Sequence, residues 1–66
     1  MKLQQLIDLM DGDTAVVIAY QYENYKYQSV EELKEDYMFY EEIRDKSIKH
    51  IWHSRTLYGC IVLEIE

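Results

Sequence analysis

Residues 14–22 are Thr14-Ala15-Val16-Val17-Ile18-Ala19-Tyr20-Gln21-Tyr22, a run dense in β-branched and aromatic residues. Such residues favour strands, and the run is too short to be a buried helix with its own ends. We therefore predict a strand here. The alternating stretch Tyr25-Lys26-Tyr27-Gln28 predicts a second strand, joined to the first by a tight hairpin at Glu23-Asn24. Because Asn tolerates positive φ and Glu is a poor first turn residue, the loop length stays open.

A short amphipathic helix is predicted before this hairpin, over residues 2–10. Its apolar residues recur at helical spacing and are Leu3, Leu6, Ile7 and Met10. Gly12 follows them, at a place where a residue in the left-handed conformation commonly ends a helix. The first helix is therefore expected to finish just before Gly12.

A second helix is predicted after the hairpin. Ser29-Val30-Glu31-Glu32 has the form of a capping box, in which a Ser hydroxyl and a Glu carboxylate satisfy free backbone amides. An apolar stripe follows at spacings of three and four, made of Val30, Leu33, Tyr37 and Tyr40. No Gly or Pro marks the end of the helix, which we place between residues 38 and 46.

The remaining sequence predicts a second hairpin, with strands at 48–53 and 57–66 around a polar turn, Ser54-Arg55-Thr56. The last strand alternates, so that one face carries Leu57, Gly59, Ile61, Leu63 and Ile65. The predicted order is α-β-β-α-β-β. This order indicates an α+β fold in which two helices pack on a small antiparallel sheet.

Length and charge narrow the class of protein. The chain has 66 residues, and thirteen acidic against seven basic residues give it a formal net charge of −6. A chain of this length encloses one core, so we predict a single domain over residues 1–66. The negative charge repels nucleic acids and anionic lipids and argues against direct binding to either. It suits a basic protein partner, although acidic composition also serves solubility.

Cysteine usage and hydropathy indicate the compartment. Cys60 is the single cysteine, so no intramolecular disulfide can form. No stretch approaches the ~20 apolar residues of a membrane span, and the N-terminus lacks the apolar run of a signal peptide. We predict a cytoplasmic protein. With no disulfide to stabilise so small a core, homo-oligomerisation, such as a homo-dimer, stays open.

Candidate metal sites do not have suitable geometry. His50-Ile51-Trp52-His53 offers two imidazoles three residues apart, but in a strand they point to opposite faces and cannot chelate one ion. Asp8, Asp11 and Asp13 surround Gly12 without the spacing of a calcium loop. We predict no metal and no cofactor.

Catalytic groups are equally sparse. Cys60 is more simply a small buried hydrophobe, and as a nucleophile it would need a base such as a histidine across the hairpin. The paired carboxylates of the second helix could act in acid–base catalysis only within a cleft, and a chain this short has few residues with which to build one. We predict that the protein is not an enzyme, while a pocket rimmed by Cys60, His50 or His53 would favour the opposite.

Two surfaces remain as candidates for binding a partner. A turn at Glu23-Asn24 would set four tyrosines on one face of the first hairpin, as an interface or as part of the core: Tyr20, Tyr22, Tyr25 and Tyr27. The second helix carries six carboxylates against Lys34 alone, which form a negative field or simply a solvated face. These carboxylates are Glu31, Glu32, Glu35, Asp36, Glu41 and Glu42.

The sequence also resembles a group of known proteins. The helix ending in Leu9-Met10-Asp11-Gly12-Asp13-Thr14, the segment Ser29-Val30-Glu31-Glu32-Leu33 and the closing Ile61-Val62-Leu63-Glu64-Ile65 are similar to small uncharacterised phage and prophage proteins of Gram-positive bacteria. Small proteins of that origin include anti-CRISPR and other anti-defence inhibitors. The resemblance implies an inhibitor or accessory protein that binds a host protein, for example a nucleic-acid-handling defence effector. The alternative is a homo-oligomeric module that buries the tyrosine face at its own interface.

Overall fold

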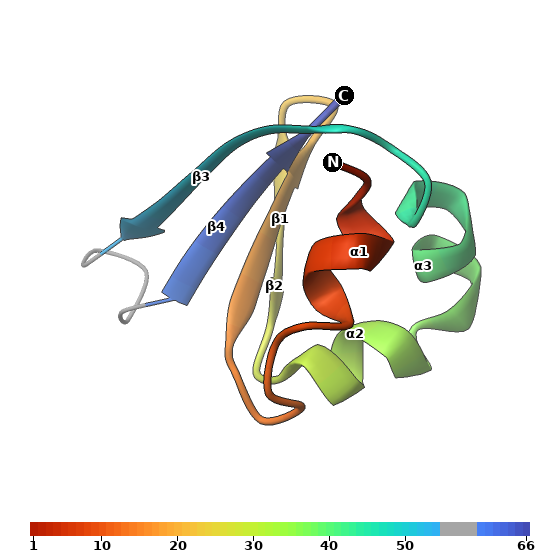
Figure 1. Ribbon diagram of the computed structural model, residues 1–66, viewed down its shortest axis with the longest axis vertical. Coiled ribbons are helices and arrows are strands. Elements are labelled where there is room, and N and C mark those ends of the chain that lie inside the picture. The colour runs from red at the N-terminus through yellow and green to blue at the C-terminus, as the bar shows by residue number, and fades with distance from the viewer. Residues whose placement is uncertain (55–59) are drawn as a thin grey trace.

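The computed structural model describes residues 1–54 and 60–66, and in these residues it contains three helices and four strands (Figure 1). In chain order they are α1 (Leu3–Ile7), β1 (Val16–Tyr20), β2 (Glu23–Tyr27), α2 (Val30–Glu35), α3 (Tyr37–Ile43), β3 (Ile48–Ser54) and β4 (Cys60–Ile65). The α+β class predicted from the sequence is confirmed. The order differs, because the second predicted helix is two helices. The predicted turn at Ser54-Arg55-Thr56 and the start of the last strand at Leu57 lie largely outside the described residues.

The four strands form one mixed sheet in the order β2-β1-β4-β3. The two hairpins are antiparallel, whereas β1 and β4 run parallel, so the prediction of a purely antiparallel sheet is wrong. Val16, Val17 and Ile18 are all buried, which places β1 inside the sheet with both faces covered. Parallel pairing needs a long crossover, and the segment between β1 and β4 provides it.

The helices lie on one side of this sheet and cover one of its faces (Figure 1). The main core lies between the two layers, where strand residues such as Ile18 and Leu63 pack with helix residues such as Leu3, Leu33 and Ile43. A smaller cluster on the opposite face contains Val17, Cys60 and Val62. The predicted alternation of the last strand is confirmed for β4, and both of its faces contribute buried side chains.

The helix predicted from Ser29 onward begins as expected and is interrupted at Asp36. The Ser29 hydroxyl accepts a hydrogen bond from the Glu32 amide at 3.0 Å, and the Glu32 carboxylate accepts one from the Gln28 amide at 3.0 Å. Asp36, with φ −77° and ψ 72°, ends α2 and begins α3. The interruption rotates the apolar stripe, so that Tyr37 is exposed, contrary to prediction, while Tyr40 is buried.

The first helix ends earlier than predicted, at Ile7, and Gly12 does not adopt the left-handed conformation expected of it. Gly12 has another role. Its carbonyl accepts a hydrogen bond from the Glu31 amide at 3.0 Å, and a β-carbon at this position would lie 2.8 Å from a carboxylate oxygen of Glu31. The absence of a side chain therefore lets the turn approach α2 closely.

Among the described residues, no helix is both long and apolar enough to cross a membrane.

Candidate functional site

The first hairpin turns at Gln21 and Tyr22, two residues earlier than the turn considered from the sequence. Both have positive φ, 51° and 67°, which is the backbone of a two-residue type I′ turn. Tyr20 therefore pairs with Glu23, Ile18 with Tyr25 and Val16 with Tyr27. A turn at Glu23-Asn24 would have placed Tyr22 opposite Tyr25 and Tyr20 opposite Tyr27, and that register is wrong.

This register separates the four tyrosines. Tyr20 and Tyr27 are buried and Tyr25 is partly buried, all beneath α3, where their ring centroids lie 6.4, 6.2 and 4.4 Å from that of Phe39. Tyr22 stands fully exposed at the tip of the turn. A tyrosine surface of four rings is therefore not formed, and three of the four belong to the core or its margin.

The buried tyrosines are held as neutral phenols. The Tyr27 hydroxyl donates to the Asp36 carboxylate at 2.7 Å, and burial together with this bond raises the pKa of Tyr27. The Tyr25 hydroxyl donates to Glu23 at 2.9 Å, and this bond raises the pKa of Tyr25. Burial, followed by the charge of Asp8, raises the pKa of Tyr40. Each of these three phenols therefore keeps its proton to a higher pH than an exposed tyrosine does.

The six carboxylates proposed for one helix face are divided by the interruption at Asp36, and half of them have internal partners. Glu32 caps α2, Asp36 accepts from Tyr27, and Glu41 pairs with Arg44 at 3.0 Å. Glu31, Glu35 and Glu42 are exposed. Glu42 lies on α3, where its charge acts on Tyr25, while Glu31 and Glu35 stand one turn apart on α2.

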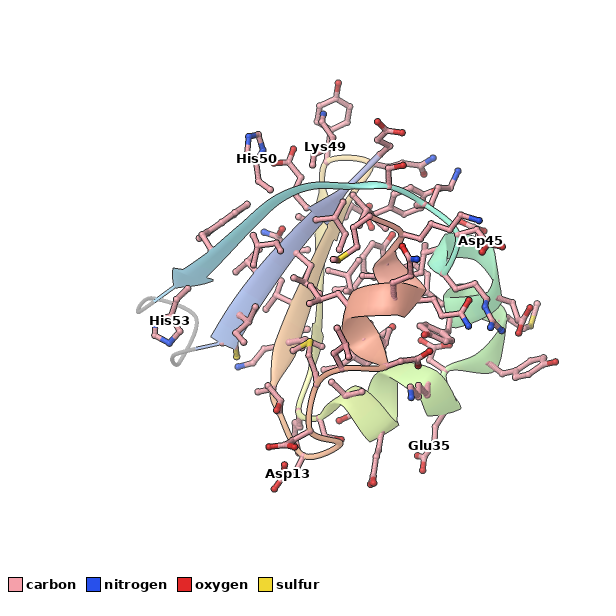
Figure 2. All side chains as sticks on the ribbon, in the orientation of Figure 1. Asp13, Glu35, Asp45, Lys49, His50 and His53 are labelled. Carbon is pink, nitrogen blue, oxygen red and sulfur yellow. The ribbon has the colours of Figure 1, made fainter. Side chains whose placement is uncertain are left out.

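The exposed carboxylates of α2 are joined by two from the preceding turn. Because Gly12 packs against Glu31, Asp11 and Asp13 are brought to the N-terminal end of α2, and all four side chains are exposed. We call Asp11, Asp13, Glu31 and Glu35 the acidic end. Figure 2 shows Asp13 and Glu35 at the same end of the molecule. Lys34 pairs with Asp8 at 3.4 Å, so its charge is already balanced by a carboxylate outside this group.

From the sequence, the aspartates beside Gly12 were considered as a calcium loop and were not joined to the acids of the second helix. The signal that could have done so is Gly12 between two acids, since a glycine often marks close approach of backbone to another element.

The last nineteen residues of the sequence carry no net formal charge. Residues 48–66 contain two acidic and two basic residues, so the whole formal charge of −6 lies in residues 1–47. Figure 2 shows Lys49 and His50 far from Asp13 and Glu35. Glu64 forms an ion pair with Lys49, whose Nζ lies 3.9 Å away, and its carboxylate lies 3.0 Å from His50 Nδ1.

The histidines and the cysteine are not brought together. His50 pairs with Glu64 and His53 with Ile61 across β3 and β4, which puts the two imidazoles on opposite faces of the sheet, as predicted. No group of three or more potential metal ligands gathers within residues 1–54 and 60–66. Cys60 is buried, in agreement with the prediction of a small core residue.

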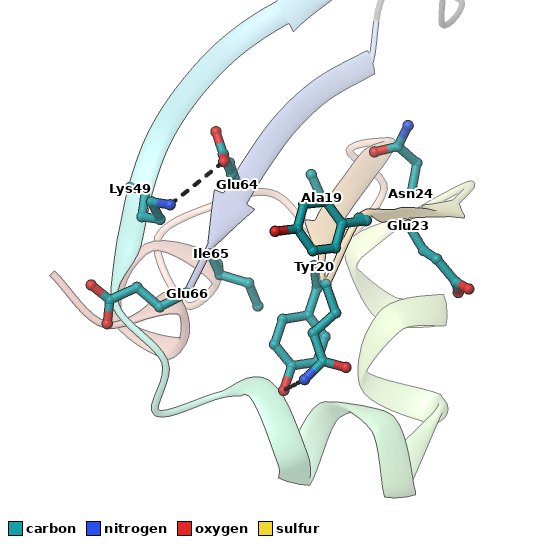
Figure 3. A pocket seen from close by; sticks show the side chains of 10 residues that line it. Ala19, Tyr20, Glu23, Asn24, Lys49, Glu64, Ile65 and Glu66 are labelled. Atoms are coloured by element: carbon teal, nitrogen blue, oxygen red, sulfur yellow. Dashed lines mark hydrogen bonds and ion pairs between the residues drawn. The ribbon is translucent and has the colours of Figure 1, made fainter.

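A hollow of about 410 Å³ opens beside the C-terminal ends of the two central strands, β1 and β4 (Figure 3). Its lining includes Tyr20, Glu23 and Asn24 on one side and Lys49 with Glu64 on the other. Cys60, His50 and His53 do not line it, so it is not the pocket that would have favoured catalysis. Several polar side chains of the lining interact with each other. Lys49 forms an ion pair with Glu64, and the Gln21 side-chain amide donates a hydrogen bond to the Tyr20 hydroxyl at 3.3 Å.

In comparisons with protein-family models, curated proteins and solved structures, nothing matched this chain.

Proposed function

We propose that this protein works by binding a basic macromolecular partner with its acidic end, as a phage-type inhibitor or accessory protein and not as an enzyme. The partner class is a protein with a positively charged groove, such as the nucleic-acid channel of a defence effector in the bacterial cytoplasm. The charge distribution supports the binding of a basic partner. The resemblance to small phage proteins supports the role of an inhibitor or accessory protein.

One observation carries the proposal: four exposed carboxylates from two chain segments gather at one end, and among the described residues none of the four forms an ion pair. Like charges at one end repel each other, so the arrangement opposes folding slightly and favours a cation from outside. A field of one sign speeds the encounter with a complementary surface and rejects acidic competitors. It also repels nucleic acid, which makes the channel protein and not its substrate the fitting partner.

The tyrosines support this proposal less than the sequence suggested. The rings of Tyr20, Tyr25 and Tyr27 pack against Phe39 within the chain. Tyr22 is therefore the one fully exposed ring of the hairpin. A single exposed ring can anchor a contact, but it does not make a surface. The acidic end is therefore the surface that we assign to the partner.

The test compares two variants with the same change in net charge. The first is Asp13→Asn, Glu31→Gln, Glu35→Gln, which neutralises three of the four carboxylates of the acidic end. The matched control is Glu42→Gln, Asp45→Asn, Glu66→Gln, which neutralises three exposed acids elsewhere. Each is immobilised beside the wild-type protein, and proteins retained from a Gram-positive host lysate are quantified by mass spectrometry at low and at high salt.

We expect a partner that the wild-type and control proteins retain, that the first variant loses by tenfold or more, and that salt releases. Circular dichroism establishes that all three proteins are folded. A partner held equally by both variants, or one indifferent to salt, would show that the acidic end is not the binding surface.

A further inference from the structure

β3 is an outer strand of the sheet, and most of its outer edge is free. The N-terminal segment covers the start of this edge, where the Ile48 amide donates to the Met1 carbonyl at 2.9 Å and Lys2 bridges to Ser47. From Lys49 to His53, no described strand pairs with the outer side of β3. Unpaired edges of this kind are templates for an added strand.

The free stretch exposes a large apolar side chain on each of its two faces. Ile51 is 54% exposed and Trp52 is 45% exposed. Ile51 pairs with Leu63 and Trp52 with Val62, so the two side chains point to opposite faces of the sheet. A partner docked on one face would cover one of them. A strand added at the edge would cover both, because it supplies cross-strand neighbours on both faces.

The charge distribution indicates which strand is added. Two molecules with charge −6 repel each other least when they meet through a part that carries no net formal charge, and residues 48–66 are such a part. The other sheet edge, β2, exposes Glu23 and Lys26 and leaves no large apolar side chain fully open. β3 also lacks acidic residues that would repel an acidic copy.

We propose that two copies of this chain pair through β3 in an antiparallel arrangement, forming one continuous sheet of eight strands across a two-fold axis. The free stretch runs from Lys49 to His53, so its midpoint, Ile51, lies on the axis. Ile51 then faces Ile51 of the second copy, and Trp52 lies beside His50 of the second copy on the other face of the sheet. Lys49 lies opposite His53 of the second copy, so no two lysines meet.

This inference does not rest on the proposed function. Figure 2 shows Asp13 and Glu35 at the bottom of the molecule, His50 near the top and His53 at one side, so pairing through β3 leaves both acidic ends open. A dimer would present two of them to a partner and raise the overall strength of binding if both can engage.

The first experiment measures the mass of the protein in solution by sedimentation equilibrium over a wide range of concentrations. We expect a monomer–dimer equilibrium for the wild-type protein. Ile51→Lys should raise the dimer dissociation constant by at least tenfold, because a charge on an edge strand opposes pairing. Met38→Lys is the control, since Met38 is 85% exposed on α3, and it should change the constant by less than twofold.

The second experiment tests the register and stays informative if Ile51→Lys fails to fold. In a Cys60→Ala background, Ile51→Cys should form an intermolecular disulfide under mild oxidation, because facing residues of an antiparallel pair have Cα atoms about 4.5–5.5 Å apart, within disulfide reach. Trp52→Cys, at the neighbouring position of similar exposure, should cross-link at least tenfold more slowly. A wild-type monomer at ~1 mM, an effect of Met38→Lys equal to that of Ile51→Lys, or faster cross-linking of Trp52→Cys would each overturn the proposal.

Discussion

The Tyr27 hydroxyl donates a hydrogen bond of 2.7 Å to the carboxylate of Asp36, the residue that separates α2 from α3. The bond joins the end of the first hairpin to the point where the helical segment changes direction. That change brings Phe39 over the tyrosine rings and Ile43 into the core. A single polar contact therefore helps to fix the angle between two helices too short to be stable alone.

Removing this bond should destabilise the protein. We expect Tyr27→Phe to lower the free energy of unfolding by about 1–2 kcal/mol, since the acceptor is a charged carboxylate and Asp36 is partly hydrated in the exposed helix junction. Urea denaturation followed by circular dichroism measures the change. No loss of stability would mean that water replaces the bond without cost.

Tyr40→Phe is the matched control, because the Tyr40 hydroxyl is buried and has no hydrogen-bond partner among the described residues. Removing it should leave stability unchanged or raise it by up to about 1 kcal/mol, since a buried hydroxyl without a partner is unfavourable. A clear loss in this variant would reveal a partner for the hydroxyl.

Stability should fall in alkaline solution. The pKa of Tyr27 is raised by burial and by its bond to Asp36, and burial also raises the pKa of Tyr40. In the unfolded chain these phenols ionise near pH 10, whereas in the folded protein they keep their protons. Their contribution is therefore complete below about pH 10 and is lost as the pH rises above it. Urea midpoints should be nearly the same at pH 8 and 9.5 and lower at pH 11, and the decrease should be smaller in Tyr27→Phe.

The sequence predicted what local patterns determine and missed what distant contacts determine. The cap at Ser29, the strand after Thr14 and the opposite facing of His50 and His53 follow from residue type and period. The interruption at Asp36 carries no Gly or Pro, and it coincides with a hydrogen bond from Tyr27, nine residues away. Likewise, the parallel pairing of β1 with β4 joins segments more than 40 residues apart, such as Val17 and Val62.

In the candidate site, too, local patterns were predictable from the sequence and contacts between distant segments were not. The acidic character of the second helix was evident from composition, but its union with Asp11 and Asp13 depends on the packing of Gly12 against Glu31. The free edge of β3 follows from strand order, which local patterns do not specify.

Substitutions in the turn of the first hairpin should increase the stability of the protein. Gln21 and Tyr22 both adopt positive φ, where side chains are unfavourable by roughly 1 kcal/mol each, and type I′ turns prefer Asn-Gly. Gln21→Asn combined with Tyr22→Gly should therefore raise the free energy of unfolding by about 1–2 kcal/mol. Thermal denaturation measures the gain, and Gln21→Ala with Tyr22→Ala is the control that removes the same side chains without relieving the strain. Equal stability of the two double variants would contradict the assigned turn.

Phe39 should contribute strongly to stability, because it is the common neighbour of three tyrosine rings. Its centroid lies 4.4 Å from that of Tyr25, and it also contacts the rings of Tyr20 and Tyr27. Because truncation leaves three rings without their common neighbour, Phe39→Ala should lower the free energy of unfolding by about 2–4 kcal/mol. Met38→Ala, one residue earlier on the exposed side of α3, should change it by less than about 0.5 kcal/mol. If Phe39→Ala is too unstable to measure, Phe39→Leu should show about half the loss. Equal small effects at both positions would mean that the tyrosines are available to a partner and are not committed to the core.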